Sequence, residues 1–254
     1  MKAMTLLFVG LFLLQVKLCA QDDYWFQKGL DTTDQKAKLE FFTKSIETEG
    51  DPGAAYFCRA SAKHELGDIK GSIEDYTKCI EIDPEDAGAY FNRGSARKEL
   101  NDYDGAMADY VRSNEIDPTN GFNICSMCLL YSVMEDFTNA LHCYATCLKI
   151  CPEKASVLTN IGWCYLGTAD YSSALEYFNK SLEIKPDFVY AYLGIALVYH
   201  FENDPVNEKK YLDRVKELQP VLKQGDLGYE TFKKEGGYYS RKNDAALKMM
   251  FGKM

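Results

Sequence analysis

Five prolines follow one another at a fixed distance along most of this chain of 254 residues. Pro84, Pro118, Pro152, Pro186 and Pro220 each lie 34 residues from the next. A fixed period of this length indicates a repeated supersecondary unit, and such units bury a continuous core only by stacking on one another. The period therefore predicts an array of similar repeats.

Each repeat carries the pattern of a helical hairpin. Apolar residues recur at spacings of three and four on two stretches, as on one face of an α-helix. Turn sequences such as Leu66-Gly67-Asp68 and Leu100-Asn101-Asp102 separate the stretches. Gly67 and Asn101 can adopt the left-handed conformation that ends a helix, and each proline stops the second helix. We therefore predict an all-α fold of antiparallel helix pairs.

Residue size at fixed positions makes these repeats resemble the tetratricopeptide family. When each proline is counted as position 32, position 8 holds small residues: Ala60, Gly94, Cys128, Gly162 and Ala196. Position 24 holds large residues: Tyr76, Tyr110, Tyr144, Phe178 and Leu212. The resemblance implies a right-handed superhelical solenoid of antiparallel helix pairs in which the first helices line a concave surface.

The resemblance covers about residues 22 to 220. We expect a degenerate first repeat at 22–52, then repeats at 53–86, 87–120, 121–154, 155–188 and 189–220. The last departs from the pattern at Pro205 and Glu208, so its second helix should begin at Asp204-Pro205. Residues 221–254 are no further repeat. We interpret them as capping helices, or alternatively as a tail that occupies the groove of this chain or of a neighbouring copy.

The first twenty residues have the composition of a secretory signal peptide. Lys2 precedes an apolar run from Thr5 to Val16, and Ala20 offers a small residue for cleavage. The run is too short to span a bilayer, and no later stretch is long enough. We therefore expect an exported protein, periplasmic or secreted, with lipid attachment at Cys19 as an alternative. The formal net charge of −9 argues against a nucleic-acid partner.

The family resemblance implies that positions 2, 5, 9, 12 and 13 of the first helices face a ligand. In the second and third repeats these positions hold Phe57, Ser61, His64, Glu65, Phe91, Ser95, Lys98 and Glu99. In the later repeats the main groove residues are Phe122, Cys125, Leu129, Val133, Thr159, Trp163, Leu166, Tyr190, Leu193, Leu197 and Phe201.

The later set is apolar, which suits an amphipathic helix or an extended apolar segment of another protein. We therefore predict an interaction scaffold that holds a protein or peptide there, with Trp163 as the main anchor. Two alternatives remain: the tail or tight packing covers these side chains, or the chain associates with itself through the tail.

Five cysteines fall within one repeat: Cys125, Cys128, Cys143, Cys147 and Cys151. We favour core filling, because Cys128 and Cys147, like Cys79, occupy positions for small apolar residues. A disulfide from Cys125 or Cys128 to Cys147 or Cys151 is the second interpretation, since an exported protein meets oxidising conditions. A thiolate metal site is the third.

The sequence contains no pattern typical of an enzyme active site. His64, His142 and His200 form no zinc-protease pair, and there is no phosphate-binding loop or nucleophile elbow. Acidic residues such as Glu74 and Asp75 are expected on solvent-facing helix positions. We therefore predict neither catalysis nor a cofactor.

Overall fold

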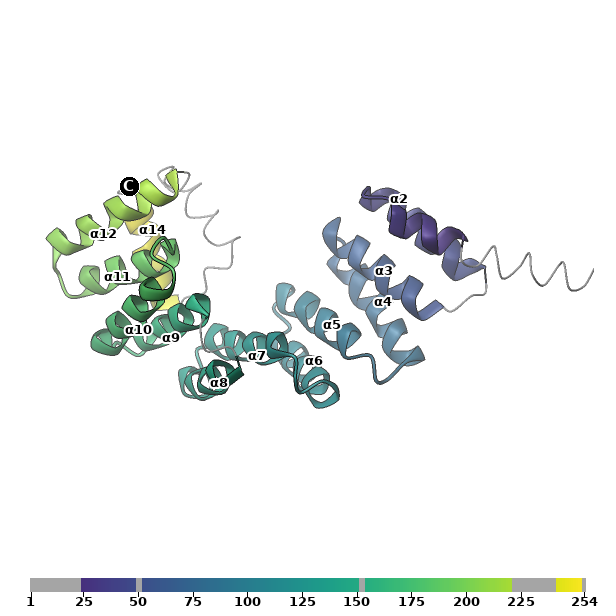
Figure 1. Ribbon diagram of the computed structural model, residues 1–254, viewed down its shortest axis with the longest axis horizontal. Helices are drawn as coiled ribbons and strands as arrows, with labels where there is room; N and C mark the ends of the chain where they lie inside the picture. The colour runs from purple at the N-terminus through teal and green to yellow at the C-terminus, as the bar shows by residue number, and fades with distance from the viewer. Residues whose placement is uncertain (1–23, 49–51, 151–153, 221–240, 253–254) are drawn as a thin grey trace, which may run out of the picture. The chain divides into compact units, whose positions relative to one another are not determined.

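The computed structural model describes residues 24–48, 52–150, 154–220 and 241–252, and its regular structure within these ranges is helical. Residues 24–31 form the first described helical segment. The labelled helices are α2 (Gln35–Glu47), α3 (Pro52–Glu65), α4 (Ile69–Ile82), α5 (Ala87–Glu99), α6 (Tyr103–Ile116), α7 (Gly121–Val133), α8 (Phe137–Ile150), α9 (Ala155–Gly167), α10 (Tyr171–Ile184), α11 (Val189–Phe201), α12 (Pro205–Leu218) and α14 (Arg241–Gly252) (Figure 1). The predicted all-α fold of antiparallel helix pairs is confirmed.

The turns between paired helices have the backbone that the sequence predicts. Gly67 and Asn101 adopt positive φ angles of 84° and 63°. The next residue, Asp68 or Asp102, caps the following helix by accepting the backbone N–H of Gly71 or Gly105. These two residues explain why each pair reverses direction within a few residues.

The last repeat starts its second helix where the sequence places it. Asp204 caps α12 and accepts the backbone N–H groups of Val206 and Asn207, with Pro205 in the first turn. Glu208 takes the position that Ser72, Ala106, Ala140 and Ala174 hold in the second to fifth repeats, and its Oε2 atom lies 3.2 Å from His200 Nδ1. A polar contact therefore replaces the usual apolar approach of the two helices there.

In three of the described helix pairs, a glycine on the first helix lies against a ring on the second helix: Gly29 against Phe42, Gly94 against Tyr110 and Gly162 against Phe178. A Cβ atom added to Gly162 would lie 2.6 Å from Cε1 of Phe178, closer than van der Waals contact allows. The degenerate first repeat makes the same contact between Gly29 and Phe42, with a corresponding distance of 2.4 Å. The size pattern of the sequence thus reflects the closeness of paired helices.

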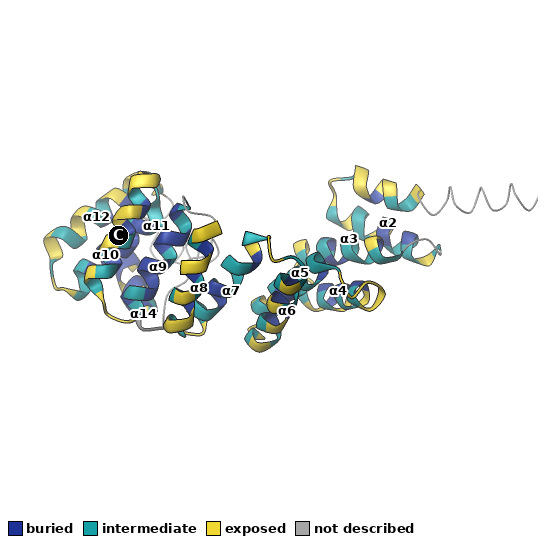
Figure 2. Ribbon diagram, turned by 60° about the horizontal axis from the view of Figure 1, so that its bottom comes forward, coloured by how far each residue is buried: buried dark blue, intermediate teal, exposed yellow. Residues whose placement is uncertain are grey.

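The chain divides into two compact units between Pro118 and Thr119. The amino-terminal unit contains α2 to α6, and the carboxyl-terminal unit contains α7 to α12 and α14. In each unit, buried residues follow the inward sides of the paired helices, and exposed residues gather at turns and outer sides (Figure 2). The regular 34-residue period gives no sign of this division.

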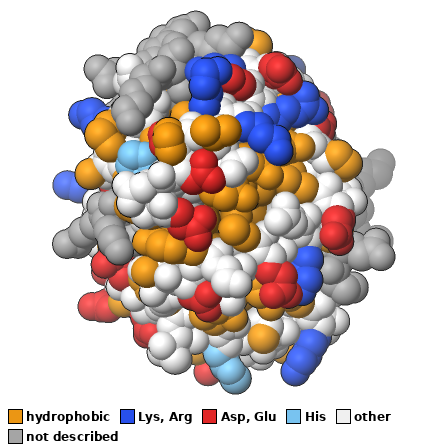
Figure 3. Space-filling view, turned by 90° about the vertical axis from the view of Figure 1, so that its left-hand side faces the viewer, with side chains coloured by type: hydrophobic (Ala, Val, Ile, Leu, Met, Phe, Trp, Pro, Cys, Tyr) orange, Lys and Arg blue, Asp and Glu red, His pale blue; other side chains and the backbone are white. Residues whose placement is uncertain are grey.

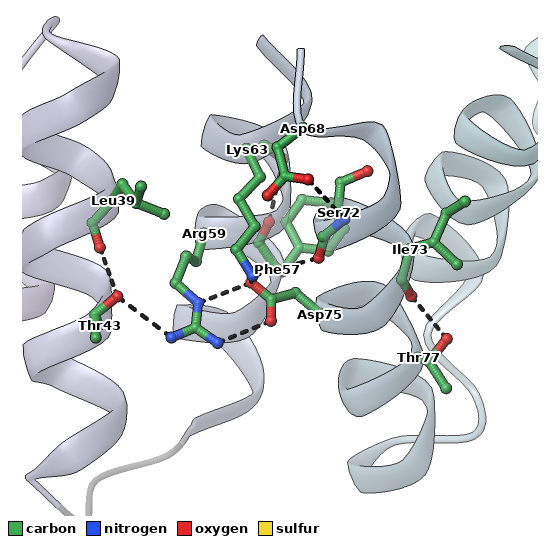
Figure 4. Close-up of polar contacts among 12 residues, drawn as sticks. Leu39, Thr43, Phe57, Arg59, Lys63, Asp68, Ser72, Ile73, Asp75 and Thr77 are labelled. Carbon is green, nitrogen blue, oxygen red and sulfur yellow. Dashed lines mark hydrogen bonds and ion pairs between the residues drawn. The ribbon is translucent and has the colours of Figure 1, made fainter. Parts of the chain in front are cut away.

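An ion-pair network ties α2, α3 and α4 together (Figure 4). Arg59 donates from Nε and Nη2 to both oxygens of Asp75, at 2.7 and 2.8 Å, and from Nη1 to Thr43 at 3.3 Å. Lys63 Nζ lies 2.9 Å from Asp75 Oδ2. The hydrogen bond to Asp75 raises the pKa of Arg59 above its usual value.

The network corrects one expectation from the sequence. Glu74 is exposed, as predicted, but Asp75 is buried, with only 5% of its side chain accessible. The prediction was wrong for Asp75 because its position on α4 faces α3, where Arg59 and Lys63 supply the compensating charge that a buried carboxylate needs.

The third repeat reproduces this network. Arg93 donates to Asp109 at 3.0 and 2.7 Å and to Thr77 at 3.2 Å, and Arg97 donates to Asp109 at 2.8 Å. The matching residues of the fifth and sixth repeats are Ile161, Tyr165 and Tyr177, then Ile195, Tyr199 and Tyr211. The rings of Tyr165 and Tyr177 stack with centroids 5.5 Å apart, as do those of Tyr199 and Tyr211.

Candidate functional site

The first helices α3 and α5 present a half-buried surface, which we call the amino face (Phe57, Ser61, His64, Phe91, Ser95 and Lys98). The Phe57 ring meets the Tyr76 ring edge-on at a centroid distance of 5.5 Å. Ser61 Oγ donates to the backbone carbonyl of Phe57 and lies 3.0 Å from the hydroxyl of Tyr76. The same arrangement recurs between Phe91, Ser95 and Tyr110 in the next repeat. These contacts hold both phenylalanines in place.

Charged side chains border the amino face. His64 Nε2 lies 2.9 Å from Glu99 Oε1, which links α3 to the end of α5. Glu65 is exposed and Lys98 is half-buried. The amino face therefore combines an apolar centre with ionisable groups of both signs.

A cavity of about 310 Å³ opens beside the amino face. Its lining includes Leu30, Lys38, Phe42, Phe57 and Glu65, so an apolar floor lies next to a basic and an acidic side chain. A second cavity of about 380 Å³ adjoins Phe57 from the other end of α3 and is lined in part by Cys58, Cys79 and Ile82. Both volumes suit side chains of a bound polypeptide.

The predicted groove of the later repeats is largely covered. The fully buried members are Thr159, Trp163, Leu166, Leu193 and Leu197. The half-buried members are Cys125, Leu129, Val133, Tyr190 and Phe201, and Phe122 is 68% exposed. The expectation of an open apolar groove was therefore wrong for the five buried residues, including Trp163, which is only 6% exposed.

The physical reason is packing within the carboxyl-terminal unit: Thr159 donates to Ser181, Trp163 meets the ring of Phe178 at a centroid distance of 5.6 Å, and α14 packs against α11. Leu247, Met250 and Phe251 of α14 are buried in the same apolar cluster as Trp163 and Leu197. Part of the predicted tail, α14, thus shares an apolar cluster with Trp163, Leu166, Leu193 and Leu197, which were predicted to contact a ligand. The other part, residues 221–240, lies outside the described residues.

Figure 3 shows a face of the carboxyl-terminal unit on which hydrophobic side chains gather between basic and acidic ones. The tyrosines of α11 and α12, namely Tyr192, Tyr199 and Tyr211, are partly buried and pack against the same apolar cluster. Lys210 and Arg214 lie over the rings of Tyr211 and Tyr192, at 5.2 and 5.8 Å from their centroids. Such cation–π contacts retain polar groups at the edge of an apolar surface.

Two disulfides join α7 to α8 within the fourth repeat. Cys125 is bonded to Cys147 and Cys128 to Cys143, with Cα–Cα distances of 6.0 and 5.2 Å. The favoured interpretation, core filling by free thiols, was therefore wrong for Cys128 and Cys147, although both are buried. Cys143 was not among the predicted disulfide partners, and Cys151 lies outside the described residues.

The described free cysteines are Cys58, Cys79 and Cys164. Burial raises the pKa of Cys79 to about 12 and that of Cys164 to about 11, and it also raises the pKa of Cys58. Because the thiolate is the reactive form, these thiols are poor nucleophiles at neutral pH. Cys79 fits the core-filling interpretation.

Comparison with protein-family models identifies the repeat. A model described as tetratricopeptide repeat matches residues 124–187, another matches residues 87–120, and a TPR-repeat model matches residues 60–101. The chain is a tetratricopeptide-repeat protein. The family predicted from the spacing of prolines and small residues is therefore confirmed. No curated protein matches the sequence.

Solved tetratricopeptide-repeat structures resemble the model. A repeat protein from Parabacteroides merdae has a TM-score of 0.71 at 15% identity, covering 91% of this chain and 99% of that one. MamA from Desulfovibrio magneticus has a TM-score of 0.61 at 15% identity, and the match covers 66% of this chain and 96% of the MamA chain. YrrB, described as a TPR protein with an unusual peptide-binding site, has a TM-score of 0.57 at 19% identity, covering 77% and 99%. At these identities the likeness establishes the fold alone.

The tetratricopeptide fold is typically a non-catalytic scaffold for protein–protein interaction. Among the described residues, no group of three or more His, Cys, Asp or Glu side chains is placed to hold a metal ion. The described helices also include none long and apolar enough to cross a membrane. The tetratricopeptide fold by itself suggests protein or peptide partners.

Proposed function

We propose that this tetratricopeptide-repeat protein is a non-catalytic scaffold that holds a polypeptide segment of another protein against its amino face. The observation that carries the proposal is a difference in burial at matched repeat positions. Ser61 and Ser95 are half-buried, whereas their counterparts Trp163 and Leu197 are buried. The amino face is therefore a first-helix surface that leaves room for a ligand, beside a cavity of about 310 Å³.

The lining of this cavity indicates the chemistry of the bound segment. Leu30 and Phe57 offer apolar contact to one large side chain, and Leu30 is 51% exposed. Lys38 and Glu65 can pair with ionised groups on either side of that residue. A segment with one apolar anchor between charged neighbours satisfies both requirements. YrrB, with its unusual peptide-binding site, gives a precedent for peptide binding within the same fold.

Our proposal includes a location outside the cytoplasm. Support comes from the signal-peptide composition of the first twenty residues and from the two disulfides, which persist in oxidising compartments. Sequencing the amino terminus of the protein isolated from its own cells tests this. A mature chain that begins at Gln21 supports export, and a chain that still begins at Met1 contradicts it.

Site-specific photo-crosslinking tests the amino face. A benzophenone amino acid replaces Phe57 on the amino face or, as a matched control, the exposed Glu74 on α4. We expect a crosslinked partner protein from position 57 and none from position 74. The Phe91→Ala substitution should weaken the crosslink from position 57. Equal crosslinking from both positions would show that the amino face is not the binding site.

A further inference from the structure

We propose that α14 is an exchangeable occupant of the carboxyl-terminal unit, and that a partner protein's amphipathic helix binds in its place. The surface concerned, which we call the carboxyl face, is the part of one buried apolar cluster that consists of Trp163, Leu166, Leu193 and Leu197, and α14 belongs to the same cluster. This second binding surface goes beyond the amino face proposed above, and either proposal can fail without the other.

The carboxyl face differs from the amino face in polarity. Position 9 of the repeat is Ser61 and Ser95 in the amino-terminal unit, but Trp163 and Leu197 in the carboxyl-terminal unit. On the same helix as Leu193 and Leu197, the ionisable His200 is already paired with Glu208. Burying an unpaired charge there would be costly, so the carboxyl face requires an occupant with an uncharged contact side.

The sequence of α14 supplies such a side. Its buried residues recur at spacings of three and four: Asn243, Ala246, Leu247, Met250 and Phe251. Ala245, Lys248 and Met249 on the opposite side are exposed. A single helix face therefore makes the contact, in the mode by which grooves recognise amphipathic helices. A partner helix with apolar residues at the spacing of Ala246, Leu247, Met250 and Phe251 has the matching chemistry.

Removal of α14 leaves the contacts inside the helix pairs in place. Phe178 fills the space beside Gly162 of its own repeat and Gly194 of the next, so α9, α10 and α11 hold one another directly. An isolated helix of 12 residues is marginal in water, so α14 owes its order to packing. Without their mutual contact, α14 would thus lose its helical order, whereas α9, α10 and α11 would keep theirs.

The connection to α12 permits exchange. Twenty-two residues, 219–240, lie between the end of α12 and the start of α14. A chain of this length can span at most about 70 Å, which sets an upper limit on how far α14 could move from its contact. Because α14 belongs to the same chain as the carboxyl face, a partner helix must compete with an intramolecular contact.

Competition with a synthetic peptide tests the proposal on the full chain. The probe is a fluorescein-labelled peptide with the sequence of residues 241–252, measured by fluorescence anisotropy. We expect at least about ten-fold tighter binding to a Leu247→Ser, Met250→Ser variant than to the parent chain, because its own α14 competes less well. A peptide carrying Leu247→Asp and Phe251→Asp should not bind either protein.

A variant altered on the outer side of α14, Ala245→Ser with Lys248→Ser, provides the matched control. It should bind the probe as weakly as the parent chain does. If the Leu247→Ser, Met250→Ser variant keeps its helical circular dichroism and binds the probe no more tightly than the parent, the proposal is overturned. Crosslinking from position 57 at the amino face should not change in this variant, which separates the two proposals.

Hydrogen exchange on the unmodified chain gives a second test that does not depend on a variant folding. Backbone amides of α14 should exchange at least about ten-fold faster than those of α9 and α11, because α14 opens by itself. Exchange of α14 only together with α9 and α11 would contradict the proposal. Dimerisation of the parent chain at rising concentration, if the probe peptide prevents it, would also contradict the proposal. In that case a second copy of this chain, and not a partner protein, would occupy the carboxyl face.

Discussion

The amino- and carboxyl-terminal units place opposite chemistries at the same three repeat positions. In the third repeat, Arg93, Arg97 and Asp109 form a half-buried ion-pair network. In the sixth repeat, the same positions hold Ile195, Tyr199 and Tyr211, and the two tyrosine rings stack. The helix pair is the same in both cases. The difference teaches that this fold requires only that the space between the paired helices is filled and that no buried charge is left unpaired. A paired set of charged side chains meets both requirements, and so does a stack of two aromatic rings.

Helix capping differs between the units in the same way. In α4 and α6, the capping Asp68 and Asp102 accept the backbone N–H of a glycine three residues on, and Asp102 Oδ2 also lies 3.7 Å from Arg97 Nε. In α10, Asp170 receives both the backbone N–H and the hydroxyl of Ser173, at 3.1 and 2.7 Å. The amino-terminal unit thus has its buried charged contacts between helices, whereas the carboxyl-terminal unit has an additional side-chain hydrogen bond at the start of α10.

The largest expected effect comes from breaking the ion-pair network of the amino-terminal unit. Asp75→Ala leaves Arg59 and Lys63 partly buried without their carboxylate, which should lower the free energy of unfolding by about 3–5 kcal/mol. Trp25 is the one tryptophan of the amino-terminal unit and Trp163 that of the carboxyl-terminal unit. Urea unfolding followed by Trp25 fluorescence in a Trp163→Phe background measures the change.

The neighbouring Glu74→Ala substitution is the control, because Glu74 is exposed on the same helix turn and should change stability little. The Trp163 transition, followed in a Trp25→Phe background, should not move in the Asp75→Ala variant. If both transitions shift equally, the two units do not unfold separately, and their free energies of unfolding cannot be compared.

A second effect, of about 3 kcal/mol, is expected from opening a disulfide of the fourth repeat. Cys125 and Cys147 are 22 residues apart, and their bond limits the unfolded chain in the carboxyl-terminal unit. The Cys125→Ser, Cys147→Ser variant should lower the Trp163 urea midpoint and leave that of Trp25 unchanged. Cys58→Ser, which removes a free thiol, serves as the control. A parent chain whose Trp163 midpoint is the same with and without reductant would argue against the bond.

Aromatic stacking should contribute less. The coupling between Tyr199 and Tyr211, measured by a double-mutant cycle with leucine at each position, should be about 0.5–1.5 kcal/mol. The Trp163 transition reports it. A coupling free energy indistinguishable from zero would mean that the two rings only fill space, and that the ion pairs of the amino-terminal unit have no aromatic equivalent.

The smallest effect concerns the cap of α10. The backbone N–H and the hydroxyl of Ser173 lower the pKa of Asp170 below its usual value. A lowered folded pKa means that the cap stabilises the fold above the unfolded pKa of about 3.9, and that this stability is lost as the pH falls through the folded pKa. In the Ser173→Ala variant the Asp170 pKa, measured by NMR titration, should rise part of the way toward its usual value. An unchanged pKa would leave the backbone N–H as the sole cause.

The sequence by itself determined the helix pairs of this protein. Pro84 and its equivalents, the turn residues Gly67 and Asn101, and the small residue opposite each ring are local requirements of backbone and volume. They act within one repeat, so a linear pattern is enough to recognise them. The same pattern placed the start of α12 at Pro205 and indicated the family.

Contacts across helices and along the chain were decided only by the tertiary structure. The burial of Asp75 depends on which side of α4 meets α3, and the pairing of Cys143 with Cys128 depends on the rotation of α8 against α7. Trp163 lies in one buried apolar cluster with residues of α14 that are more than eighty positions away. Sequence periodicity reports the faces of each helix, but the partner of each face is set by packing over long separations. The apolar surface therefore could be predicted from the sequence, whereas its occupant could not.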